Sequence, residues 1–361
     1  MPRTRMLVSQ CDVGTIIAED VKNYPGITLV AKDSVLNQYI LDRLMDMGIT
    51  HVWIYTADAL VSKEEIDTDN NININSNSNS NSKKELIMTS HAEAVLVVKQ
   101  VLRELSSGGK LNYPKITQLS KLVYGNINDS VNVIKYLNNI KDKDEYTYTH
   151  CANVAFYAML IAKWLNLAKE EIEKVIQAGL LHDIGKVLIP DEILNKRGKL
   201  SDVELDIMKN HALLGYFCLK ALTEISQSIK DAVLSHHERS DGSGYPYGLR
   251  GDEIDLYAKI IAIADVYDAM TQDRVYKKGV NPFVAFEMFQ TLGMGTFDIH
   301  VLKVFLKNIS LNFTGFNVIL ENGERGEIVY VPPYEITKPV ILNGSSFIDI
   351  TQSNKKILSI T

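Results

Sequence analysis

"HHERSDGSGYP", from His236 to Pro246, is the stretch of the chain that says most about the fold. Two adjacent histidines close a predicted helix, and a segment with two glycines and a Tyr-Pro pair follows them directly. Loops do not need neighbouring imidazoles and apolar cores seldom tolerate them, whereas a metal site uses them well. The glycines permit a tight turn immediately after the histidines. The stretch therefore raises the question of which other side chains join these two.

Further histidines lie on the helices predicted around this stretch. Five of the eight histidines fall in one span, each on a predicted helix or at its end. Asp183 follows one of them, and Asp265 interrupts an otherwise apolar helix, where a lone carboxylate is costly unless it pairs with a charge or a metal. Imidazole and carboxylate together suit divalent metals such as Fe, Mn or Zn. Each signal alone has a structural explanation, but the ordered set is hard to explain as packing: His150, His182-Asp183, His211, His236-His237 and Asp265.

These residues carry a resemblance to a known family. "HDIGK", the spaced His211, "HHERSDGSGYP" and "ADVYDAMTQDRVY" resemble the motifs of the HD-GYP family, a branch of the HD metal-dependent phosphohydrolases. The similarity extends over residues 150–305, about half of the chain. The family implies an all-helical domain that hydrolyses the bacterial second messenger cyclic di-GMP.

The resemblance also implies roles for single residues. Asp183, the expected bridging carboxylate, and Lys186 are the expected catalytic residues. Tyr245, in the Gly-Tyr-Pro signature, is expected near the substrate, and Lys186, Arg274 and Lys277 match positions that contact its phosphates. The metal ligands that the resemblance implies are His150, His182, Asp183, His211, His236, His237 and Asp265.

The number of metals follows from a departure from the family pattern. Members with three metals have a glutamate one helical turn before the first histidine, and here that position is Tyr146. We therefore expect two divalent transition-metal ions, with Fe or Mn favoured and Zn or Ni as alternatives. Two ions about 3.5–4 Å apart lower the pKa of a bridging water and neutralise the oxygens of a phosphodiester, which otherwise repel a nucleophile. Lys186 and Arg274 would add positive charge to the same phosphates.

The rest of the chain predicts a mainly α protein with smaller strand-bearing ends. The pattern alternates from Ile16 to Tyr55, so residues 1–62 are expected to form a small α+β module for regulation or assembly. Residues 63–85 are an Asn/Ser-rich tract typical of a flexible linker. Helical periodicity dominates residues 86–312, where the HD-type catalytic domain with its helical lead-in is expected. Residues 313–361 contain short alternating runs that predict a small β appendage.

The composition of the chain limits the kinds of partner and the location that we expect for it. The formal net charge of −6 argues against a long nucleic acid, and the apolar runs are too short to cross a membrane. Three widely spaced cysteines without a CxxC pair indicate a reduced compartment, so we expect a cytoplasmic protein. Cyclic di-GMP is the expected ligand, and a second copy of the chain or a signalling protein is a candidate partner.

Two alternatives to cyclic di-GMP hydrolysis stay open. One is a catalytically silent module that binds cyclic di-GMP or docks a partner, although degenerate relatives would be expected to lose ligands and none is missing here. The other keeps the metal chemistry but acts on a different cyclic dinucleotide or nucleotide.

Overall fold

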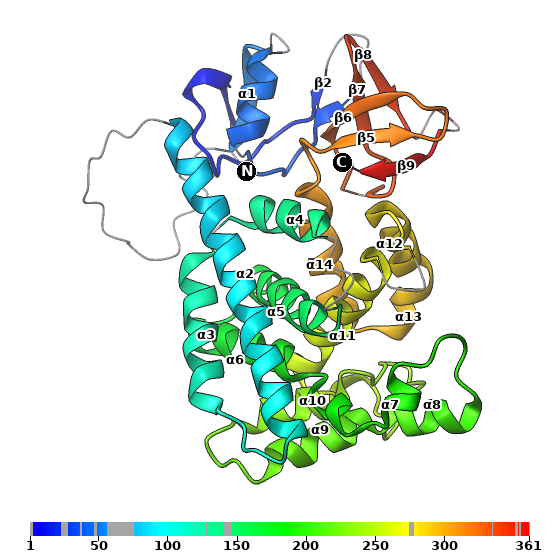
Figure 1. Ribbon diagram of the computed structural model, residues 1–361. Helices are drawn as coiled ribbons and strands as arrows, with labels where there is room; N and C mark the ends of the chain where they lie inside the picture. Colours follow the sequence, from blue (N-terminus) through cyan, green and yellow to red (C-terminus); the bar gives the residue numbers. More distant parts are fainter. Residues whose placement is uncertain are drawn as a thin grey trace. The chain divides into compact units, whose positions relative to one another are not determined.

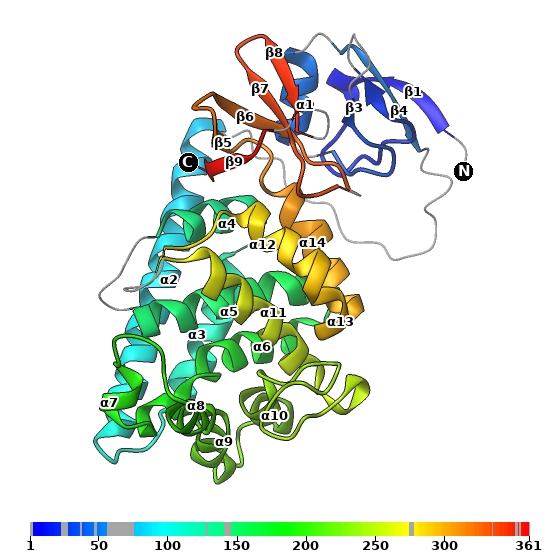
Figure 2. The same ribbon diagram turned by 90° about the vertical axis from the view of Figure 1, so that its right-hand side faces the viewer.

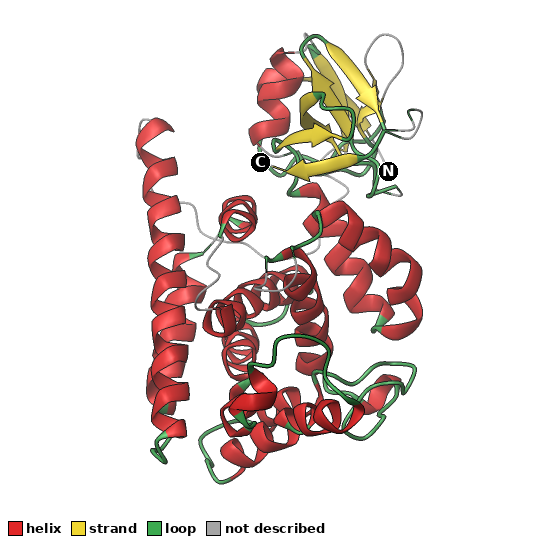
Figure 3. Ribbon diagram, turned by 45° about the vertical axis from the view of Figure 1, so that its right-hand side comes forward, coloured by secondary structure: helices red, strands yellow, loops and turns green. Residues whose placement is uncertain are grey.

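The computed structural model describes residues 3–22, 28–36, 38–46, 49–55, 76–127, 129–140, 146–273, 278–333, 335–350, 353 and 355–360. The chain divides into two compact units. The sheet unit comprises Met1–Ile74 and Ile309–Thr361, and the helical unit comprises Asn75–Asn308. The described strands lie in the sheet unit, as Figure 3 shows. The predicted fold class, mainly α with smaller strand-bearing ends, is confirmed.

Helices of very different length build the helical unit (Figure 1). The sequence "SDVE" at residues 201–204 predicts a capping box, and Ser201 and Glu204 form it at the start of α8. The Asn281 side chain caps α12. The helices are α2 (Ser76–Ser106), α3 (Tyr113–Asn126), α4 (Ser130–Asn139), α5 (Tyr146–Trp164), α6 (Lys169–Leu181), α7 (Asp191–Leu194), α8 (Asp202–Lys209), α9 (His211–Lys220), α10 (Gln227–Ser235), α11 (Leu256–Thr271), α12 (Pro282–Met288), α13 (Met294–Thr296) and α14 (Ile299–Leu311), with the short turns η3 (Ile184–Leu188), η4 (Gly251–Glu253) and η5 (Phe289–Gly293).

Helix α5 is the centre of the helical unit. Its residues 149–162 are all buried, as expected for a helix that is apolar on every side. Helices α2, α6 and α11 pack around it, and Figures 1 and 2 show α5 enclosed by these neighbours. The helix therefore supplies a dry environment for any polar side chain that it carries.

The close packing of α5 against α6 depends on Gly179. A Cβ atom at this position would lie 2.6 Å from the Cα atom of Ala155 and 2.9 Å from its backbone nitrogen. Real Cβ atoms do not approach a backbone this closely, so any larger side chain would push the two helices apart.

The sheet unit combines both ends of the chain. The antiparallel strands β1 (Arg3–Leu7) and β4 (His51–Tyr55) pair, as do β2 (Val21–Lys22) and β3 (Thr28–Val30). A core that includes Leu36, Leu44 and Ile54 packs beneath them, beside η1 (Val8–Gln10) and α1 (Gln38–Asp46). The C-terminal segment forms one antiparallel sheet of order β8-β7-β6-β5-β9, with strands β5 (Asn317–Leu320), β6 (Arg325–Tyr330), β7 (Val340–Asn343), β8 (Ser346–Asp349) and β9 (Ile357–Ile360).

The N-terminal and C-terminal segments, predicted as separate parts, share one unit. Phe347 of β8 packs against the N-terminal core, and Ala31 packs against the cluster of Val329, Tyr330 and Val340. Strand β1 was not predicted from the sequence, because "RTRML" at Arg3–Leu7 begins with three polar residues and has no buried position. Apolar burial across two segments distant in sequence cannot be read from either segment alone.

The predicted linker at residues 63–85 needs a correction at its C-terminal end. Helix α2 begins at Ser76, so the last part of the Asn/Ser tract is helical. Asn and Ser are weak helix formers, but a helix nucleated in the amphipathic segment behind them gains one hydrogen bond for each residue it adds. The rest of the predicted linker, up to residue 75, lies outside the described residues.

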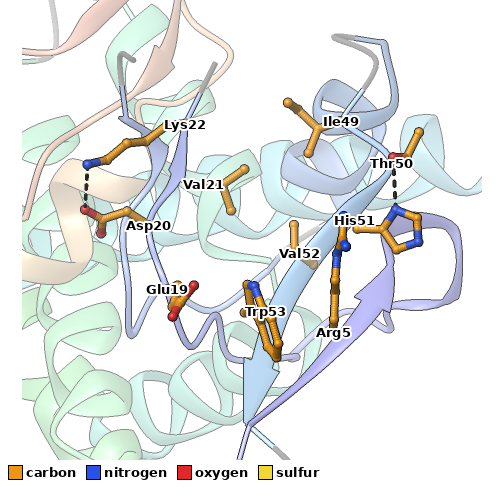
Figure 4. Close-up of a pocket in the computed structure, with 10 residues that line it drawn as sticks. All are labelled: Arg5, Glu19, Asp20, Val21, Lys22, Ile49, Thr50, His51, Val52 and Trp53. Carbon is orange, nitrogen blue, oxygen red and sulfur yellow. Dashed lines mark hydrogen bonds and ion pairs between the residues drawn. The ribbon is translucent and has the colours of Figure 1, made fainter. Parts of the chain in front are cut away.

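A polar pocket of about 300 Å³ opens beside β4, and Arg5, Glu19, His51 and Trp53 are among the residues that line it (Figure 4). These side chains are not part of the predicted metal site.

Within the described part of the chain, no helix has both the length and the apolar character that spanning a membrane requires.

We predict that Gly179→Ala lowers the free energy of unfolding by about 1–3 kcal/mol, because the added methyl group collides with the backbone of α5. Gly125→Ala is the matched control, since a Cβ atom at this position of α3 meets nothing within 4 Å. Alanine is the better helix former, so the control should be neutral or slightly stabilising. Urea denaturation followed by circular dichroism measures both, and equal stability of the two variants would contradict the packing argument.

Candidate metal centre

The seven predicted ligands come together in the interior of the helical unit. They lie on five helices or at helix ends, and the elements that carry them adjoin one another in Figures 1 and 2. Six are buried and His237 is partly exposed. Their positions are His150 on α5, His182 and Asp183 after α6, His211 at the start of α9, His236 and His237 after α10, and Asp265 on α11.

Asp183 belongs to two groups of candidate ligand atoms. One group joins it to His150 and His182, and the other joins it to His211, His236 and His237. In each group the ligand atoms all lie within 4.8 Å of one another. The carboxylate is therefore the part shared between two adjacent places for a cation.

The remaining carboxylate lies beside these groups. Asp265 Oδ1 lies 3.1 Å from His150 Nε2, and its Oδ2 lies 3.9 Å from His237 Nδ1. Asp183 Oδ2 lies 3.8 Å from the same nitrogen of His150. Asp265 therefore reaches a histidine of each group.

Four of the histidines are held through Nδ1. Three donate this N–H to the backbone carbonyl three residues earlier, and His150 donates it to the Asp268 carboxylate. With the proton on Nδ1, the Nε2 lone pair of a neutral imidazole can ligate a metal. His150 differs from the other three: burial acts to lower its pKa, but hydrogen bonds to Asp265 and Asp268 raise it to about 9, so a cation bound there would replace the proton on Nε2. The distances are 2.8 Å from His182 to Gly179, 2.7 Å from His211 to Met208, 2.9 Å from His236 to Val233, and 2.7 Å from His150 to Asp268 Oδ2.

Several of these lone pairs face one another across short gaps. His211 Nε2 lies 3.4 Å from His236 Nε2 and 3.4 Å from Asp183 Oδ1. With the protons on Nδ1, neither contact has a hydrogen to share. His182 Nε2 and Asp183 Oδ1 are buried atoms without a hydrogen-bond partner. Buried polar atoms are normally satisfied, so this arrangement fits cations placed between the ligands, and the residues present can bind metal.

Burial and charge set the protonation of the cluster. Burial lowers the pKa of His211 and His236, and it lowers that of His237 to about 3, so these imidazoles are neutral. Burial alone would raise the pKa of Asp183, but Lys186 and His182 hold it well below its usual range. Neutral imidazoles and an ionised carboxylate are the forms that ligate a metal.

Lys186 lies next to the shared carboxylate. Its Nζ donates to Asp183 Oδ2, and about a quarter of its side chain is exposed. Burial acts to lower the pKa of this lysine, but the Asp183 carboxylate raises it, so the side chain stays protonated. Arg274 and Lys277, the other two predicted phosphate contacts, lie outside the described residues.

Gly185 allows the Asp183 segment to approach the start of α9. A Cβ atom at Gly185 would lie 2.0 Å from the carbonyl oxygen of His211 and 2.4 Å from the nitrogen of Gly215. The glycine of "HDIGK" therefore brings the Asp183 turn against His211. The sequence predicts a single helix that opens at Ser201 and carries His211 inside it. This prediction is wrong, because that helix ends at Lys209 and His211 begins α9.

The Gly-Tyr-Pro loop folds back over the cluster. The Tyr245 ring stacks on His237, with ring centroids 4.6 Å apart and planes 26° apart. A Cβ atom at Gly244 would lie 2.4 Å from the backbone nitrogen of Arg239, so only glycine allows this return. Tyr245 therefore covers the partly exposed side of His237.

Two buried acids were missed as parts of the site. Glu238, left unassigned from the sequence, accepts hydrogen bonds from the backbone nitrogens of Tyr247 at 2.7 Å and Leu249 at 3.0 Å, and so fixes the loop. Asp268 orients His150. Its signal was available, since it lies three residues after Asp265 on the same apolar helix.

Known proteins are similar to this chain in sequence and in fold. The HD domain family matches residues 136–301. A cyclic di-GMP phosphodiesterase of Pseudomonas aeruginosa is 33% identical over 304 residues, which cover 81% of this chain and 73% of that protein. A 3'3'-cGAMP-specific phosphodiesterase of Vibrio cholerae is 40% identical over 146 residues, or 40% of this chain and 28% of that protein.

A solved structure agrees with the fold. The HDG"Y"P protein of Bdellovibrio bacteriovorus covers 84% of this chain and 98% of its own, with a TM-score of 0.51 and 16% sequence identity. At this identity the likeness concerns the fold alone. The Pseudomonas relative, the HD domain match and the motifs around His182 and His236 confirm the resemblance seen in the sequence: the chain belongs to the HD-GYP family of HD-domain proteins.

Proposed function

We propose that this protein is a metal-dependent phosphodiesterase that hydrolyses cyclic di-GMP to the linear dinucleotide pGpG, with GMP as the product of any second cleavage. The observation that carries the proposal is the pair of ligand groups sharing Asp183, in which unprotonated nitrogens face one another in a buried site. The activity named for the Pseudomonas relative supports the same substrate.

Two divalent ions are proposed for the two ligand groups, with Fe or Mn expected ahead of Zn or Ni. His150 and His182 would hold one ion and His211, His236 and His237 the other, with Asp183 between them. Asp265 would complete the set from α11. Bound there, the ions would supply positive charge towards the phosphate oxygens and a water of lowered pKa.

The residues of the chain have distinct tasks in the hydrolysis. Water oxygen forms a bond to phosphorus, the bond to the 3′ oxygen breaks, and that oxygen takes up a proton. Asp183 is ionised, so it can accept hydrogen bonds and bind a cation but cannot donate a proton to the leaving oxygen. Lys186 keeps its proton and lies beside Asp183, where its charge can stabilise a phosphate oxygen or the leaving oxygen.

Tyr245, Arg274 and Lys277 are proposed to bind the substrate. Tyr245 can stack a guanine or meet a phosphate with its hydroxyl, and Arg274 and Lys277 are proposed to bind the phosphates. The stacking of Tyr245 on His237 supports its part in this scheme, since it places the phenol ring next to the ligands. All three cysteines are free, which supports a cytoplasmic location, where a nucleotide messenger would be met.

A second candidate substrate is 3'3'-cGAMP. The Vibrio relative named for it is 40% identical over the matched residues, against 33% for the relative named for cyclic di-GMP. The two substrates differ in one base only, so the metal chemistry is the same. Cyclic di-GMP is favoured because the match to its phosphodiesterase extends over far more of the chain.

With Mn²⁺ or Fe²⁺, the purified protein is expected to convert cyclic di-GMP to pGpG, because the ligand groups supply the charge that phosphodiester cleavage needs. Liquid chromatography of the products measures this, with 3'3'-cGAMP and a nucleoside monophosphate assayed in parallel. EDTA should abolish turnover and added metal restore it. Stable cyclic di-GMP with both metals would refute the assignment, and tight binding without product would favour a silent binding module.

Asp183→Asn is expected to weaken Mn²⁺ binding by more than about 100-fold, because it removes the charge shared by both ligand groups. Titration calorimetry measures the affinity, and elemental analysis measures the bound metal. Mn²⁺ should raise the Tm of the wild type but not of the variant. Asp206→Asn, the same change at an exposed carboxylate, is the control; if both variants bind Mn²⁺ like the wild type, Asp183 is not a ligand.

Tyr245→Ala is expected to raise the KM for cyclic di-GMP about tenfold or more, because base–aromatic stacking contributes about 1–3 kcal/mol. Tyr247→Ala is the matched control, since Tyr247 lies in the same loop but is 62% exposed. Steady-state kinetics compares the two. An equal effect of both changes would mean that the loop as a whole, and not the ring of Tyr245, determines substrate affinity.

A further inference from the structure

A chain of buried hydrogen bonds runs from the metal centre to helix α2. It begins at His150, whose Nδ1 lies 2.7 Å from Asp268 Oδ2. Asn153 Nδ2 donates to Asp268 Oδ1 at 2.9 Å, and Asn153 Oδ1 lies 2.8 Å from His91 Nε2. His91 and these three partners are at most 4% exposed. The chain thus links α5, α11 and α2 through the interior of the helical unit.

The chemistry of the four groups fixes the direction of every hydrogen bond. Asp268 can only accept as a carboxylate, so the Asn153 amide must turn its NH₂ group towards it and its oxygen towards His91. His91 must then carry a proton on Nε2. His91 Nδ1 lies 3.4 Å from the Tyr136 hydroxyl, at the far end of hydrogen-bonding range, and is left to accept. Burial lowers the pKa of His91, and with a neutral His91 and an ionised Asp268 this assignment gives each of the four groups its partner.

We propose that His91 is a positioning residue for the metal centre: through Asn153 and Asp268 it fixes the tautomer and the ring orientation of His150. The inference rests on the proposed function of the site as a metal-dependent centre. With Nδ1 bound to Asp268, the His150 ring directs Nε2 towards Asp183 and Asp265, where a bound cation would lie. Metal affinity depends on such partners of ligating histidines, whose loss typically costs 10–100-fold.

His91 acts because it leaves the Asn153 amide a single orientation. Without the His91 donor, Asn153 Oδ1 would be buried without its partner, and the amide could turn or withdraw from Asp268. Asp268 would then keep a buried charge with one donor fewer and would hold His150 less firmly. Two aromatic contacts, to Tyr136 and Phe156 at 5.3 Å between ring centroids, hold the His91 ring in place.

The test compares two substitutions of His91 in the full-length protein. His91→Phe keeps a ring of similar size but removes the donor, and it should weaken Mn²⁺ binding about tenfold and lower kcat by a similar factor, with KM little changed. His91→Gln keeps an N–H that can reach Asn153 and should restore most of both losses. Calorimetric titration with Mn²⁺ gives the affinity without relying on turnover.

A matched control separates positioning from general stability. Tyr113 donates a buried hydrogen bond to Gln177, which in turn donates to Ser120 at 2.9 Å, so this network resembles the His91 chain but does not end on a ligand. Tyr113→Phe should lower the Tm and leave Mn²⁺ affinity unchanged. Asn153→Ser breaks the His91 chain one step nearer to the metal with a smaller side chain, and it carries the test if His91→Phe does not fold.

The outcomes are distinct. The inference is supported if Mn²⁺ affinity and kcat fall in His91→Phe and in Asn153→Ser. His91→Gln should then recover most of both. Wild-type Mn²⁺ affinity in a folded His91→Phe or Asn153→Ser variant overturns it, as does a loss of Tm alone. If the wild type binds Mn²⁺ but does not hydrolyse cyclic di-GMP, the proposed substrate fails while the affinity measurements still decide the role of His91.

Discussion

The constraint on which the centre depends is the burial of two carboxylates among imidazoles that carry no proton where they face one another. An ionised group in a dry core is costly unless an opposite charge lies next to it. Lys186 supplies one charge to Asp183, but the lone pairs of His211 and His236 face each other at 3.4 Å and gain nothing from that lysine. The cluster becomes favourable when cations occupy the space between the ligands. The stability of this part of the helical unit and its chemistry therefore have one physical origin.

Helix ends explain how the histidines are oriented. His182, His211 and His236 each donate Nδ1–H to a carbonyl in the last turn of α6, α8 or α10, where backbone carbonyls have no partner within the helix. One contact thus satisfies an unpaired carbonyl and leaves Nε2 as a ligand. Helix C-termini also carry partial negative charge, so three of them meeting at one place favour bound cations. This answers why two histidines stand together after α10: the first satisfies the helix end, and the second reaches the other side of the site beneath Tyr245.

The histidines and aspartates that meet in the cluster could be predicted from the sequence, whereas the residues that orient them and the pairing of the two chain ends could not. The histidine and aspartate motifs, the capping box at Ser201 and the apolar run of α11 are local patterns, so they were visible from spacing alone. What escaped depends on contacts between distant segments. Strand β1 is defined by its pairing with β4, and the joining of the two chain ends in one unit depends on Phe347 and Ala31. The loop role of Glu238 needed the positions of Tyr247 and Leu249.

The distances along the chain show why the second layer cannot be predicted in the same way. Asn153 is 115 residues from Asp268 and 62 residues from His91, and from the sequence His91 has no acidic or histidine neighbour to mark it. The role of His91 is seen only in the structure. There the Asp268 carboxylate fixes the direction of each hydrogen bond from Asn153 to His91. A displacement of α2 relative to α5 would break this chain at the His91–Asn153 bond. The position of α2 and the orientation of His150 are therefore coupled through these hydrogen bonds. In the sequence, α2 follows the segment that connects it to the N-terminal module.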